Sequence, residues 1–403
     1  MSCVRDSLHL LSLPHEVRKL SAVGEGLRGR VLLDASMVRT GGGYTHLMNL
    51  LPEISRLAPD LDFMLLASPT LWSEAFDGIP NLEFYPVSEG GMFRRYLFLL
   101  FRAGRVASDW KADVYFSVAE YTPPSLPCPM IASFRNPNIF TALRQGWGVK
   151  QTLRLAFLRQ LAKVSARRCV RILFVSEDSA KWIGDRVDVP ERKRVVIHHG
   201  IDSTHFLPSA ERADSPKVGV LSVSSVYRYK NFVRLIEAWH LWVERAGESR
   251  VPDLTIIGDV QDRWYFSEIQ AAVRATGRHA ARIHVLGSVP YSRIAGYYAA
   301  ADLFVFPSYL ETFGHPLVEA MASGLPVVAA NIPVFREIAG DAALYADPYD
   351  VGDLSRAMEK ALISDEESAT RSALARDRVS ELSWNANARN LSELFREVMS
   401  LKT

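Results

Sequence analysis

The sequence predicts an α/β protein made of two doubly wound, Rossmann-like domains that face each other across a cleft. The chain has 403 residues, 48% of them hydrophobic and 23% charged, which is enough for two buried cores. Short β-branched or apolar runs alternate with stretches of helical periodicity along the chain. A polar stretch with two prolines, 207–217, interrupts this alternation and indicates a linker between the two domains.

The predicted strands are apolar runs bounded by turn residues. In the first domain, 30–206, they occupy 30–36, 62–68, 112–118, 130–134 and 171–176. In the second domain, 218–380, they lie within 217–225, 253–260, 282–289, 302–308 and 326–330. The helical stretches between them would cover both faces of two mostly parallel sheets. The remaining segments, 1–29 and 381–403, are predicted to be an N-terminal extension and a C-terminal helix that packs back toward the first domain.

Several classes of protein do not fit the composition. The three cysteines, at positions 3, 128 and 169, have no paired spacing and predict neither disulfides nor a zinc cluster. The one D-x-D, Asp60-Leu61-Asp62, falls between a helix and a strand and is interpreted as a solvated turn rather than a metal site. We find no signal peptide and no apolar run of roughly 20 residues, so we expect a cytoplasmic chain that does not span a membrane. Nucleic acid is not an expected partner, since the basic residues are not interleaved with a recognised module.

Two glutamates, Glu311 and Glu319, stand eight positions apart around a Phe-Gly-His-Pro turn. Glu311 is expected in the loop after a strand and Glu319 in the first turns of the next helix. Ligands of parallel sheets bind at this end of the strands, where helix N–H groups favour anions or oxygen-rich groups. Two carboxylates there can accept hydrogen bonds from vicinal hydroxyls, as in a ribose or a hexose. Alternatively, Glu319 is a first-turn helix charge and Glu311 a solvated loop residue.

The stretch YYAAADLFVFPSYLETFGHPLVEAMASGLPVVAAN, 297–331, resembles the core of the family 4 glycosyltransferases, the retaining "glycosyl transferases group 1" of GT-B fold. Segments 34–54, 174–183, 195–206 and 222–232 are similar to other parts of the family pattern, in order, so the resemblance spans roughly residues 30 to 400. It implies transfer of a hexose from a nucleotide-diphosphate sugar to a glycan or lipid-linked acceptor, without a metal or other cofactor.

The resemblance also implies roles for individual residues. Lys230 would bind the donor diphosphate and stabilise the leaving group. Glu311 would contact the transferred hexose, and Glu319 would hold the ribose hydroxyls. The catalytic residues would thus be Lys230 and Glu311, and the donor would be bound by Gly42, Gly43, Arg228, Lys230, Phe313, Gly314 and Glu319.

This sequence departs from the family pattern at two places. The family usually has an arginine five or six residues before the lysine, where this chain has Ser224 and Ser225, and Arg228 is the expected substitute. A family histidine near the sugar is replaced by Arg135 and Asn136. The alternative function is therefore a catalytically impaired protein that only binds a nucleotide sugar. His46 and His315 are either pocket contacts or, more in keeping with their type, structural histidines.

Both glutamates are assigned to substrate hydroxyls, so we expect no carboxylate nucleophile. The leaving group would depart and the acceptor would attack on the same face, with the diphosphate accepting the acceptor's proton. A pyridoxal-phosphate phosphorylase or a sugar-nucleotide epimerase of similar architecture would not carry this glutamate motif.

Basic residues are concentrated in one part of the predicted first domain. Between 92 and 171 there are 14 Lys or Arg and 3 Asp or Glu, a local charge of +11. Phe93, Leu97, Leu100 and Phe101 have helical spacing beside Arg94, Arg95, Arg102 and Arg105. Such helices are either ordinary core helices with solvated basic backs or a surface that lies on an anionic membrane. The second interpretation predicts peripheral membrane contact through 92–171, at the inner face of the membrane.

Overall fold

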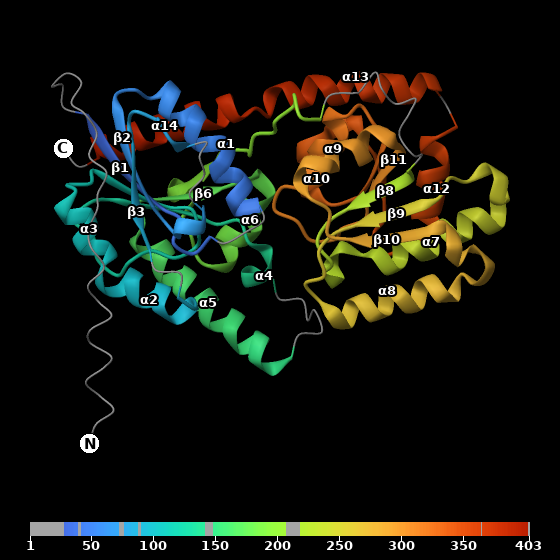
Figure 1. The fold of residues 1–403 in the computed structure, drawn as a ribbon, viewed down its shortest axis with the longest axis horizontal. Helices are drawn as coiled ribbons and strands as arrows, with labels where there is room; N and C mark the ends of the chain where they lie inside the picture. Colours follow the sequence, from blue (N-terminus) through green and yellow to red (C-terminus); the bar gives the residue numbers. More distant parts are fainter. Residues whose placement is uncertain are drawn as a thin grey trace. The chain divides into compact units, whose positions relative to one another are not determined.

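The structure is a computed structural model, shown as a ribbon in Figure 1. It describes residues 28–38, 42–71, 76–87, 90–141, 148–206, 218–363 and 365–401. The predicted linker, 207–217, and residues 1–27 of the predicted extension lie outside this described part.

The first sheet has seven strands in the order β3-β2-β1-β4-β5-β6-β7. The pairs β1–β2, β1–β4, β2–β3 and β6–β7 are parallel. The strands are β1 (Gly29–Asp34), β2 (Leu61–Ala67), β3 (Leu82–Pro86), β4 (Val114–Ser117), β5 (Met130–Ser133), β6 (Arg171–Phe174) and β7 (Arg194–Val196). The order, with β1 inside the sheet and crossovers on either side of it, is that of a doubly wound fold.

Helices separate these strands. They are α1 (Gly42–Leu57), α2 (Met92–Phe101), α3 (Ala103–Asp109), α4 (Pro137–Phe140), α5 (Val149–Arg168) and α6 (Glu177–Arg186), with short 3-10 turns η2 (Pro69–Leu71) and η4 (Glu191–Lys193). Asn136 and Ser176 cap α4 and α6 through their side chains, as expected of residues that favour helix starts.

The second sheet has six strands in the order β10-β9-β8-β11-β12-β13, and all its pairs are parallel. They are β8 (Gly219–Val223), β9 (Leu254–Ile257), β10 (Ile283–Gly287), β11 (Ala301–Phe306), β12 (Val327–Ala330) and β13 (Leu344–Ala346). The helices are α7 (Phe232–Ala246), α8 (Arg263–Ala275), α9 (Tyr291–Ala300), α10 (His315–Ala322), α11 (Pro333–Ala339), α12 (Val351–Ala361), α13 (Asp365–Glu381) and α14 (Trp384–Ser400). Four 3-10 turns complete it, η6 (Arg228–Lys230), η7 (Glu248–Arg250), η8 (Gly277–Arg282) and η9 (Gly340–Ala342).

Helices cover both faces of this second sheet. One face carries α9, α10 and α13, and the other carries α7, α8 and α12 (Figure 1). Neighbouring residues of one strand supply the two cores in turn, so that Phe304 of β11 packs on the first face and Leu303 and Val305 on the second. The continuous apolar run of β11 follows from this double burial.

The chain folds into two compact units, one of Met1–Ile131 with Ser392–Thr403 and the other of Ala132–Leu391. Strands β6 and β7 therefore belong to the same unit as the second sheet. The last residues of α14 belong to the first unit, where the ring of Phe395 lies 5.5 Å from that of Phe116 and 6.5 Å from that of Phe63. Arg396 pairs with Asp60 there. The predicted domain boundaries themselves stay a prediction.

The predicted architecture is confirmed, and each predicted strand corresponds to an observed one. Three observed strands were not predicted: β3, β7 and β13. Each has three to five residues, and β3 and β7 are edge strands with few fully buried positions. Such short, half-exposed strands lack the apolar run on which the prediction rested.

The D-x-D motif does lie where a turn enters β2. Asp60 accepts hydrogen bonds from Arg396, and Asp62 pairs with Arg28. Both carboxylates are thus neutralised by arginines, consistent with a surface role rather than a metal site. Cys128 and Cys169 are buried free thiols, and Cys3 lies outside the described residues. Within the described helices, none combines the length and the apolar character that crossing a membrane requires.

Candidate functional site

The predicted site begins where β11 ends and the chain turns into α10. Gly314 is the residue before the helix and has φ +100°, a conformation that L side chains rarely adopt. A Cβ at Gly314 would also lie 2.9 Å from the ring of Phe335. The helix begins at His315, with Pro316 in its first turn. Glycine is therefore required for the chain to turn here.

Lys230 and Glu311 form an ion pair at the centre of the site. Lys230 Nζ lies 2.5 Å from Glu311 Oε1, and their side chains are only 11% and 10% exposed. The ammonium also lies 5.1 Å from the ring centroid of Tyr229 and 5.5 Å from that of Phe306. The two residues predicted to be catalytic are thus brought together from η6 and from the loop after β11.

The position of Lys230 depends on the next residue, Asn231. Its backbone is left-handed, with φ 65°, and separates η6 from α7. Its buried side chain donates to the carbonyls of Pro307, at 3.1 Å, and Pro348, at 2.7 Å. The side-chain amide of Asn231 therefore connects η6, which carries Lys230, to the loops that follow β11 and β13. Asparagine is one of the few non-glycine residues that adopt this backbone conformation readily.

Glu319 lies on α10 and is oriented by a buried tyrosine. The hydroxyl of Tyr298, on α9, donates a hydrogen bond of 2.8 Å to Glu319 Oε2. Tyr298 is fully buried. Burial raises the pKa of Glu319 to about 7, although the hydrogen bond from Tyr298 opposes this rise. Near neutral pH the carboxyl group is therefore divided between its charged and protonated forms.

Arg228, the expected substitute for the family arginine, is paired with another residue. Its guanidinium donates two hydrogen bonds to Glu268 of α8, at 2.5 and 2.7 Å, and lies 5.1 Å from the ring centroid of Tyr265. This bidentate pair holds the head group against α8. Ser224 is buried and Ser225 exposed in the loop after β8.

Gly258 fixes the backbone of a second loop at the predicted donor end. A Cβ there would lie 1.7 Å from the carbonyl oxygen of Ser224. Only glycine permits such a close approach between the loops that follow β8 and β9.

The loop before α10 also contacts residues that follow β5, β6 and β7 of the first sheet and belong to the same compact unit. Ser176 Oγ donates to the carbonyl of Thr312 at 2.7 Å, and Thr312 Oγ1 donates to the carbonyl of Arg135 at 2.8 Å. The ring of His199 lies 5.4 Å from Phe313 and 4.9 Å from His315. Side chains from other parts of the unit thus fix the positions of Thr312, Phe313 and His315.

His315 is uncharged at neutral pH. Burial lowers its pKa to about 4, and the nearby charge of Arg135 lowers it further. A neutral ring packed on Phe313 and His199 fits the structural role expected for this histidine. Arg135, which takes the place of the family histidine, thus acts electrostatically on the first residue of α10.

The remaining predicted residues belong to the other compact unit. Gly42 and Gly43 are the first residues of α1, and a Cβ at Gly43 would lie 3.2 Å from the side chain of Val38. Gly41 lies outside the described residues. His46 is buried on α1. Each compact unit is described by itself, so the part that these residues take in donor binding stays a prediction.

Four functional neighbours were not predicted from the sequence: Tyr229, Asn231, Tyr298 and His199. All four lie inside segments that were quoted for the family resemblance. Their residue types are ordinary in strand-end loops and buried helices, so no spacing or charge pattern distinguishes them. Their contacts with the predicted site residues become visible only in the folded structure.

Two family models match the chain and together cover most of it. The model described as "Glycosyltransferase Family 4" matches residues 40–205, and the model described as "Glycosyl transferases group 1" matches residues 205–378. They meet at residue 205, just before the predicted linker.

Curated relatives match parts of the chain. The O-antigen chain mannosyltransferase RfbU of Salmonella typhimurium is 29% identical over 194 residues, which is 48% of this chain and 51% of that protein. The O-antigen chain mannosyltransferase B of Escherichia coli is 43% identical over 104 residues, which is 25% of this chain and 27% of that protein. The match thus spans about half of the first relative and about a quarter of the second.

Solved structures match nearly the whole chain at low identity. Sucrose-phosphate synthase from Thermosynechococcus elongatus superposes with a TM-score of 0.74 at 17% identity, over 93% of this chain and all of that one. Anabaena HepE, solved with UDP and glucose, superposes with a TM-score of 0.69 at 17% identity, over 92% of this chain and all of that one. At such identities the likeness concerns the fold. Together with the two family models it shows that the fold is GT-B and that the chain belongs to the family 4 glycosyltransferases.

Proposed function

We propose that this chain transfers a hexose from a nucleotide-diphosphate sugar to a glycan or lipid-linked acceptor, with retention of the anomeric configuration and without a metal. The observation that carries the proposal is the enclosed ion pair of Lys230 and Glu311 beside the start of α10. A lysine held among two aromatic rings and a carboxylate is a positioned positive charge, and such a charge stabilises a diphosphate leaving group.

Donor binding would break the ion pair between Lys230 and Glu311. The ammonium of Lys230 would turn to the diphosphate, and the Glu311 carboxylate would then accept hydrogen bonds from the hexose. Glu319 would accept hydrogen bonds from the ribose diol, with Tyr298 fixing its orientation. Glu311 would thereby exchange its protein partner for hydroxyls of the donor, whereas Glu319 would keep its bond from Tyr298 and accept further ones.

The transfer step follows from this arrangement of charge. As the bond between the anomeric carbon and the phosphate oxygen breaks, negative charge grows on the diphosphate and is stabilised by Lys230 and by the N–H groups at the start of α10. The acceptor hydroxyl attacks the same face, and the departing phosphate oxygen accepts its proton. Because Lys230 supplies the positive charge, a divalent metal is not required for leaving-group departure.

The relatives supply a first choice for the sugar. RfbU and the mannosyltransferase B of E. coli are named for mannosyl transfer to an O-antigen chain. We propose mannose as the transferred hexose and a growing surface polysaccharide or its lipid-linked precursor as the acceptor.

A thermal-shift screen with UDP, GDP, ADP and dTDP tests the donor site first. A ligand at 100 times its dissociation constant adds about 2.7 kcal/mol of stability, which such a screen detects. We expect one base to stand out. The corresponding radiolabelled sugar donor is then offered with extracted lipid-linked glycans, and the anomeric configuration of the product is read by NMR. An inverted product, or four nucleotides without any shift, would contradict the proposal.

One observation favours a second candidate, a protein that binds a nucleotide sugar without transferring it. The guanidinium of Arg228, the expected substitute for the family arginine, is paired with Glu268 of α8. Nucleotide binding without turnover on any acceptor would support this candidate. Glu268→Ala separates the two, since it frees Arg228 and should raise the turnover of an enzyme that needs this arginine.

Exposed apolar side chains next to basic ones support peripheral membrane contact. On α2, Leu100 is 51% and Phe101 75% exposed, with Arg94 and Arg102 also at the surface. One predicted contact is wrong: Arg95 is only 5% exposed, and its Nε donates to the carbonyl of Gly90. The side chain of Phe93 lies outside the described part.

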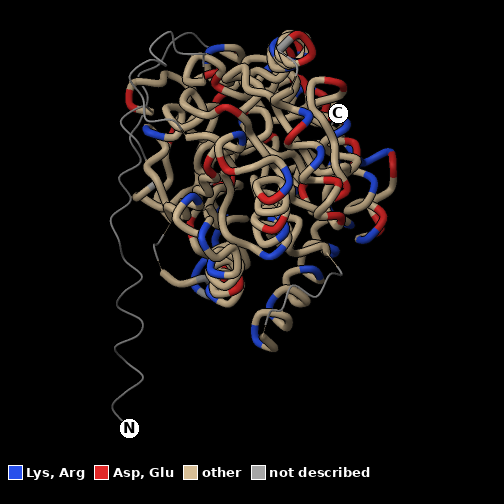
Figure 2. Tube along the Cα trace, turned by 90° about the vertical axis from the view of Figure 1, so that its right-hand side faces the viewer, with Lys and Arg blue, Asp and Glu red and all other residues tan. Residues whose placement is uncertain are grey.

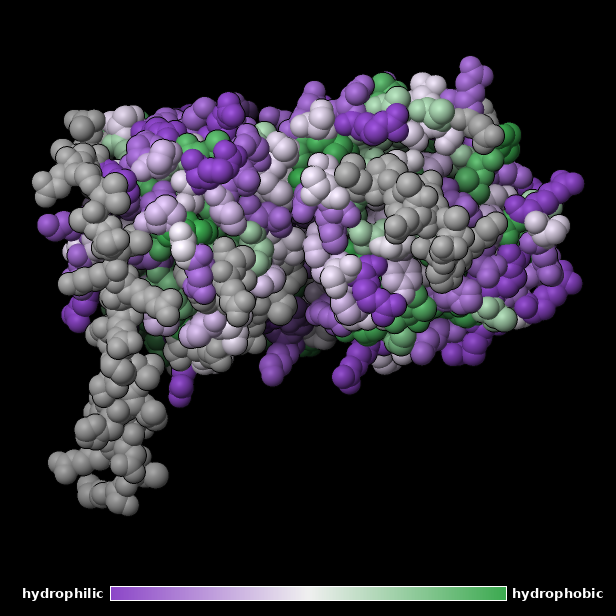
Figure 3. Space-filling view, turned by 45° about the horizontal axis from the view of Figure 1, so that its top comes forward, coloured by the Kyte–Doolittle hydropathy of each residue, from purple (hydrophilic) through white to green (hydrophobic). Residues whose placement is uncertain are grey.

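Helix α5 carries a second such surface. Val149, Leu153 and Phe157 recur every fourth residue and are 76%, 66% and 58% exposed, with the exposed Lys150 and Arg154 beside them. Figure 2 marks the charged positions along the chain. By contrast, hydrophobic residues on the face in Figure 3 are scattered among hydrophilic ones. We propose that α2 and α5 contact the anionic inner face of a membrane.

Liposome co-sedimentation tests this contact. We expect salt-sensitive binding to phosphatidylglycerol vesicles and little to phosphatidylcholine. The double variant Leu153→Ser with Phe157→Ser should abolish binding to the vesicles. Leu286→Ser, at an exposed leucine of β10, is the control and should leave binding unchanged. Equal binding to both lipids would favour an acceptor in solution.

A further inference from the structure

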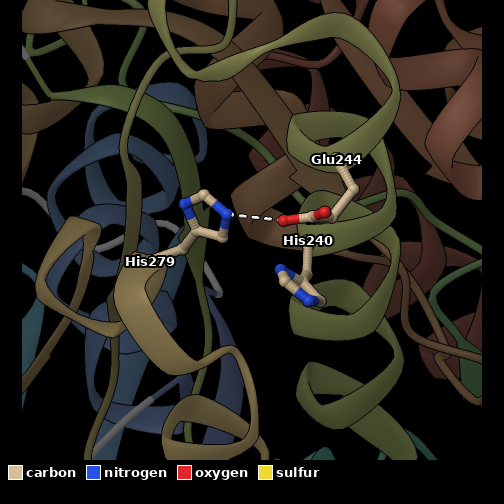
Figure 4. A group of neighbouring side chains, drawn as sticks. All are labelled: His240, Glu244 and His279. Atoms are coloured by element: carbon tan, nitrogen blue, oxygen red, sulfur yellow. Dashed lines mark hydrogen bonds and ion pairs between the residues drawn. The ribbon is translucent and has the colours of Figure 1, made fainter.

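Three side chains that commonly bind metals gather at the C-terminal half of α7. His240 and Glu244 lie one turn apart on α7, and His279 reaches them from η8 (Figure 4). One possible ligand atom from each residue lies within 4.8 Å of the other two. None of these residues belongs to the donor site described above.

The donor set suits one class of metal. Two imidazoles and one carboxylate form a common ligand set for zinc, in which the fourth position is open to water. Ligands about 2.0 to 2.2 Å from Zn²⁺ would lie closer together than 4.8 Å, so the side chains must move slightly inward. Glu244 can do so because its side chain is 50% exposed, which also leaves a path for water.

His279 is already oriented for coordination. Its Nε2 faces Glu244 Oε1 at 2.7 Å, while its Nδ1 lies 3.4 Å from Glu248 Oε1. The ring is only 1% exposed, so its direction is fixed by packing. In metal sites, a carboxylate on the second ring nitrogen typically sets the tautomer and directs the lone pair of the first to the metal. Glu248 lies near that nitrogen, but the contact does not have hydrogen-bond geometry, so the carboxylate must approach further to take that role.

His240 has a nitrogen that lacks a partner. Among the described residues, its Nδ1 is buried and makes no hydrogen bond. Its ring centroid lies 5.4 Å from that of His279. A buried polar atom without a partner is uncommon in folded proteins and indicates something that the protein chain does not supply. A metal held between the two rings would satisfy it.

One neighbour opposes a cation. Arg278 Nε donates a hydrogen bond of 3.3 Å to His279 Nε2, the proposed ligand atom, and lies 3.2 Å from Glu248 Oε1. Arg278 Nη2 lies 3.7 Å from Glu244 Oε1. The arginine side chain is 74% exposed, so its head group can move into solvent. Without a metal, the same residues form a surface ion-pair cluster, which is the ordinary alternative.

We propose that His240, Glu244 and His279 bind a divalent transition metal such as Zn²⁺, which fastens η8 to α7. Glu244 lies 12 residues beyond the start of α7, about 18 Å along the helix axis from the end that follows Lys230. The metal would therefore stabilise the second sheet's outer layer and take no part in sugar transfer, which we expect to be metal-independent.

The test uses untagged, full-length protein treated with a chelator and then titrated with Zn²⁺ and Co²⁺. We expect one tight site, a rise of a few degrees in melting temperature, and the visible absorption bands of four-coordinate Co²⁺. Glu244→Gln and His240→Ala should each weaken Zn²⁺ binding at least 10-fold, and Glu248→Gln more modestly. Arg278→Ala should strengthen it, since the competing charge is removed. Mg²⁺ should have no such effect.

The matched control is His284→Ala, because His284 also lies beside a carboxylate, Asp253, but outside the cluster. Its Zn²⁺ affinity should equal that of the wild type. Glu244 is exposed, so Glu244→Gln tests the site even if a histidine variant folds poorly. The proposal is overturned if Co²⁺ gives no visible bands, or if Zn²⁺ binds Glu244→Gln and wild type equally. Nucleotide binding serves as the readout that the donor site is intact in every variant.

Discussion

Helix α6 begins behind a serine, whereas helix α10 begins behind a glycine. At α6, Ser176 and Ser179 form a reciprocal capping box, and Glu337 accepts the N–H groups of Glu177 at 2.7 Å and Asp178 at 3.0 Å. At α10, Gly314 offers no side chain, and the first turn contains no acidic residue. Both helices lie in the same compact unit and follow a parallel strand.

Within one compact unit, some helix starts thus serve the stability of the fold, and others are left open for a ligand. The N–H groups that open a helix have no partner within it and carry partial positive charge. At α6 the chain supplies the carboxylate itself, so that end is closed to anions. At α10 no described side chain caps the turn, and Lys230 and Glu311 stand beside it. We therefore expect changes at α10 to affect the donor and changes at α6 to affect stability.

Lys230→Ala should have the largest effect, because it removes the positive charge beside the open helix start. Turnover should fall roughly 100-fold or more, by comparison with the loss of one preorganised stabilising group. The measurement is the rate of radiolabelled sugar transfer. Lys181→Ala, an exposed lysine on α6, is the matched control and should leave the rate unchanged. A Lys230→Ala variant with wild-type turnover would remove the leaving-group role.

Glu337→Ala should instead lower the free energy of unfolding, by about 1–3 kcal/mol. It leaves the first N–H groups of α6 and the ring of His198, 2.9 Å from Glu337, without their carboxylate. Urea unfolding monitors the change, and nucleotide thermal shifts should keep their size. The exposed Glu381→Ala provides the baseline for a surface glutamate. A loss of nucleotide binding in Glu337→Ala would show that the two helix starts are not separate in function.

Glu319→Gln should weaken nucleoside diphosphate binding by about 10-fold, which corresponds to one hydrogen bond of about 1.4 kcal/mol. The amide keeps the size of the side chain and loses one strong acceptor for the ribose diol. Isothermal titration with the preferred nucleotide measures the change. Glu367→Gln, an exposed glutamate on α13, is the control. Equal affinity in Glu319→Gln and wild type would assign the ribose to other residues.

The raised pKa of Glu319 should make the free energy of unfolding drift with pH, a change that no substitution is needed to reveal. Burial raises this pKa from 4.5 to about 7, so the folded state retains a proton that the unfolded state releases. The stabilisation is present below about pH 4.5 and is lost as the pH rises through about 7. Between pH 5 and pH 8, wild type should lose on the order of 2–3 kcal/mol relative to Glu319→Gln. If the free energy of unfolding changes equally with pH in wild type and in Glu319→Gln, the assignment is wrong.

The start of α10 could be predicted from the sequence, whereas the carboxylate that caps the start of α6 could not. Gly314 and the two glutamates could be located, because the strand, the turn and the helix each have a distinct local pattern. The partner of α6 could not, because Glu337 lies 160 positions after Glu177 and no local signal joins them. The same holds for Tyr298 on Glu319 and for Glu268 on Arg228. The local backbone conformation depends on neighbouring residues, so a sequence pattern can predict it. Side-chain pairs between helices depend on the tertiary packing, which no local pattern shows.

The course of α14 bears on how the protein forms and how it can be divided. Phe395 is fully buried against Phe63 and Phe116, and Arg396 pairs with Asp60, all within the first compact unit. The residues of the first unit that are made first, up to Ile131, thus lack a piece of their own core until Phe395 has been made. Cutting the gene within 207–217 would separate that piece from the rest, so two halves expressed apart would not be two self-sufficient domains.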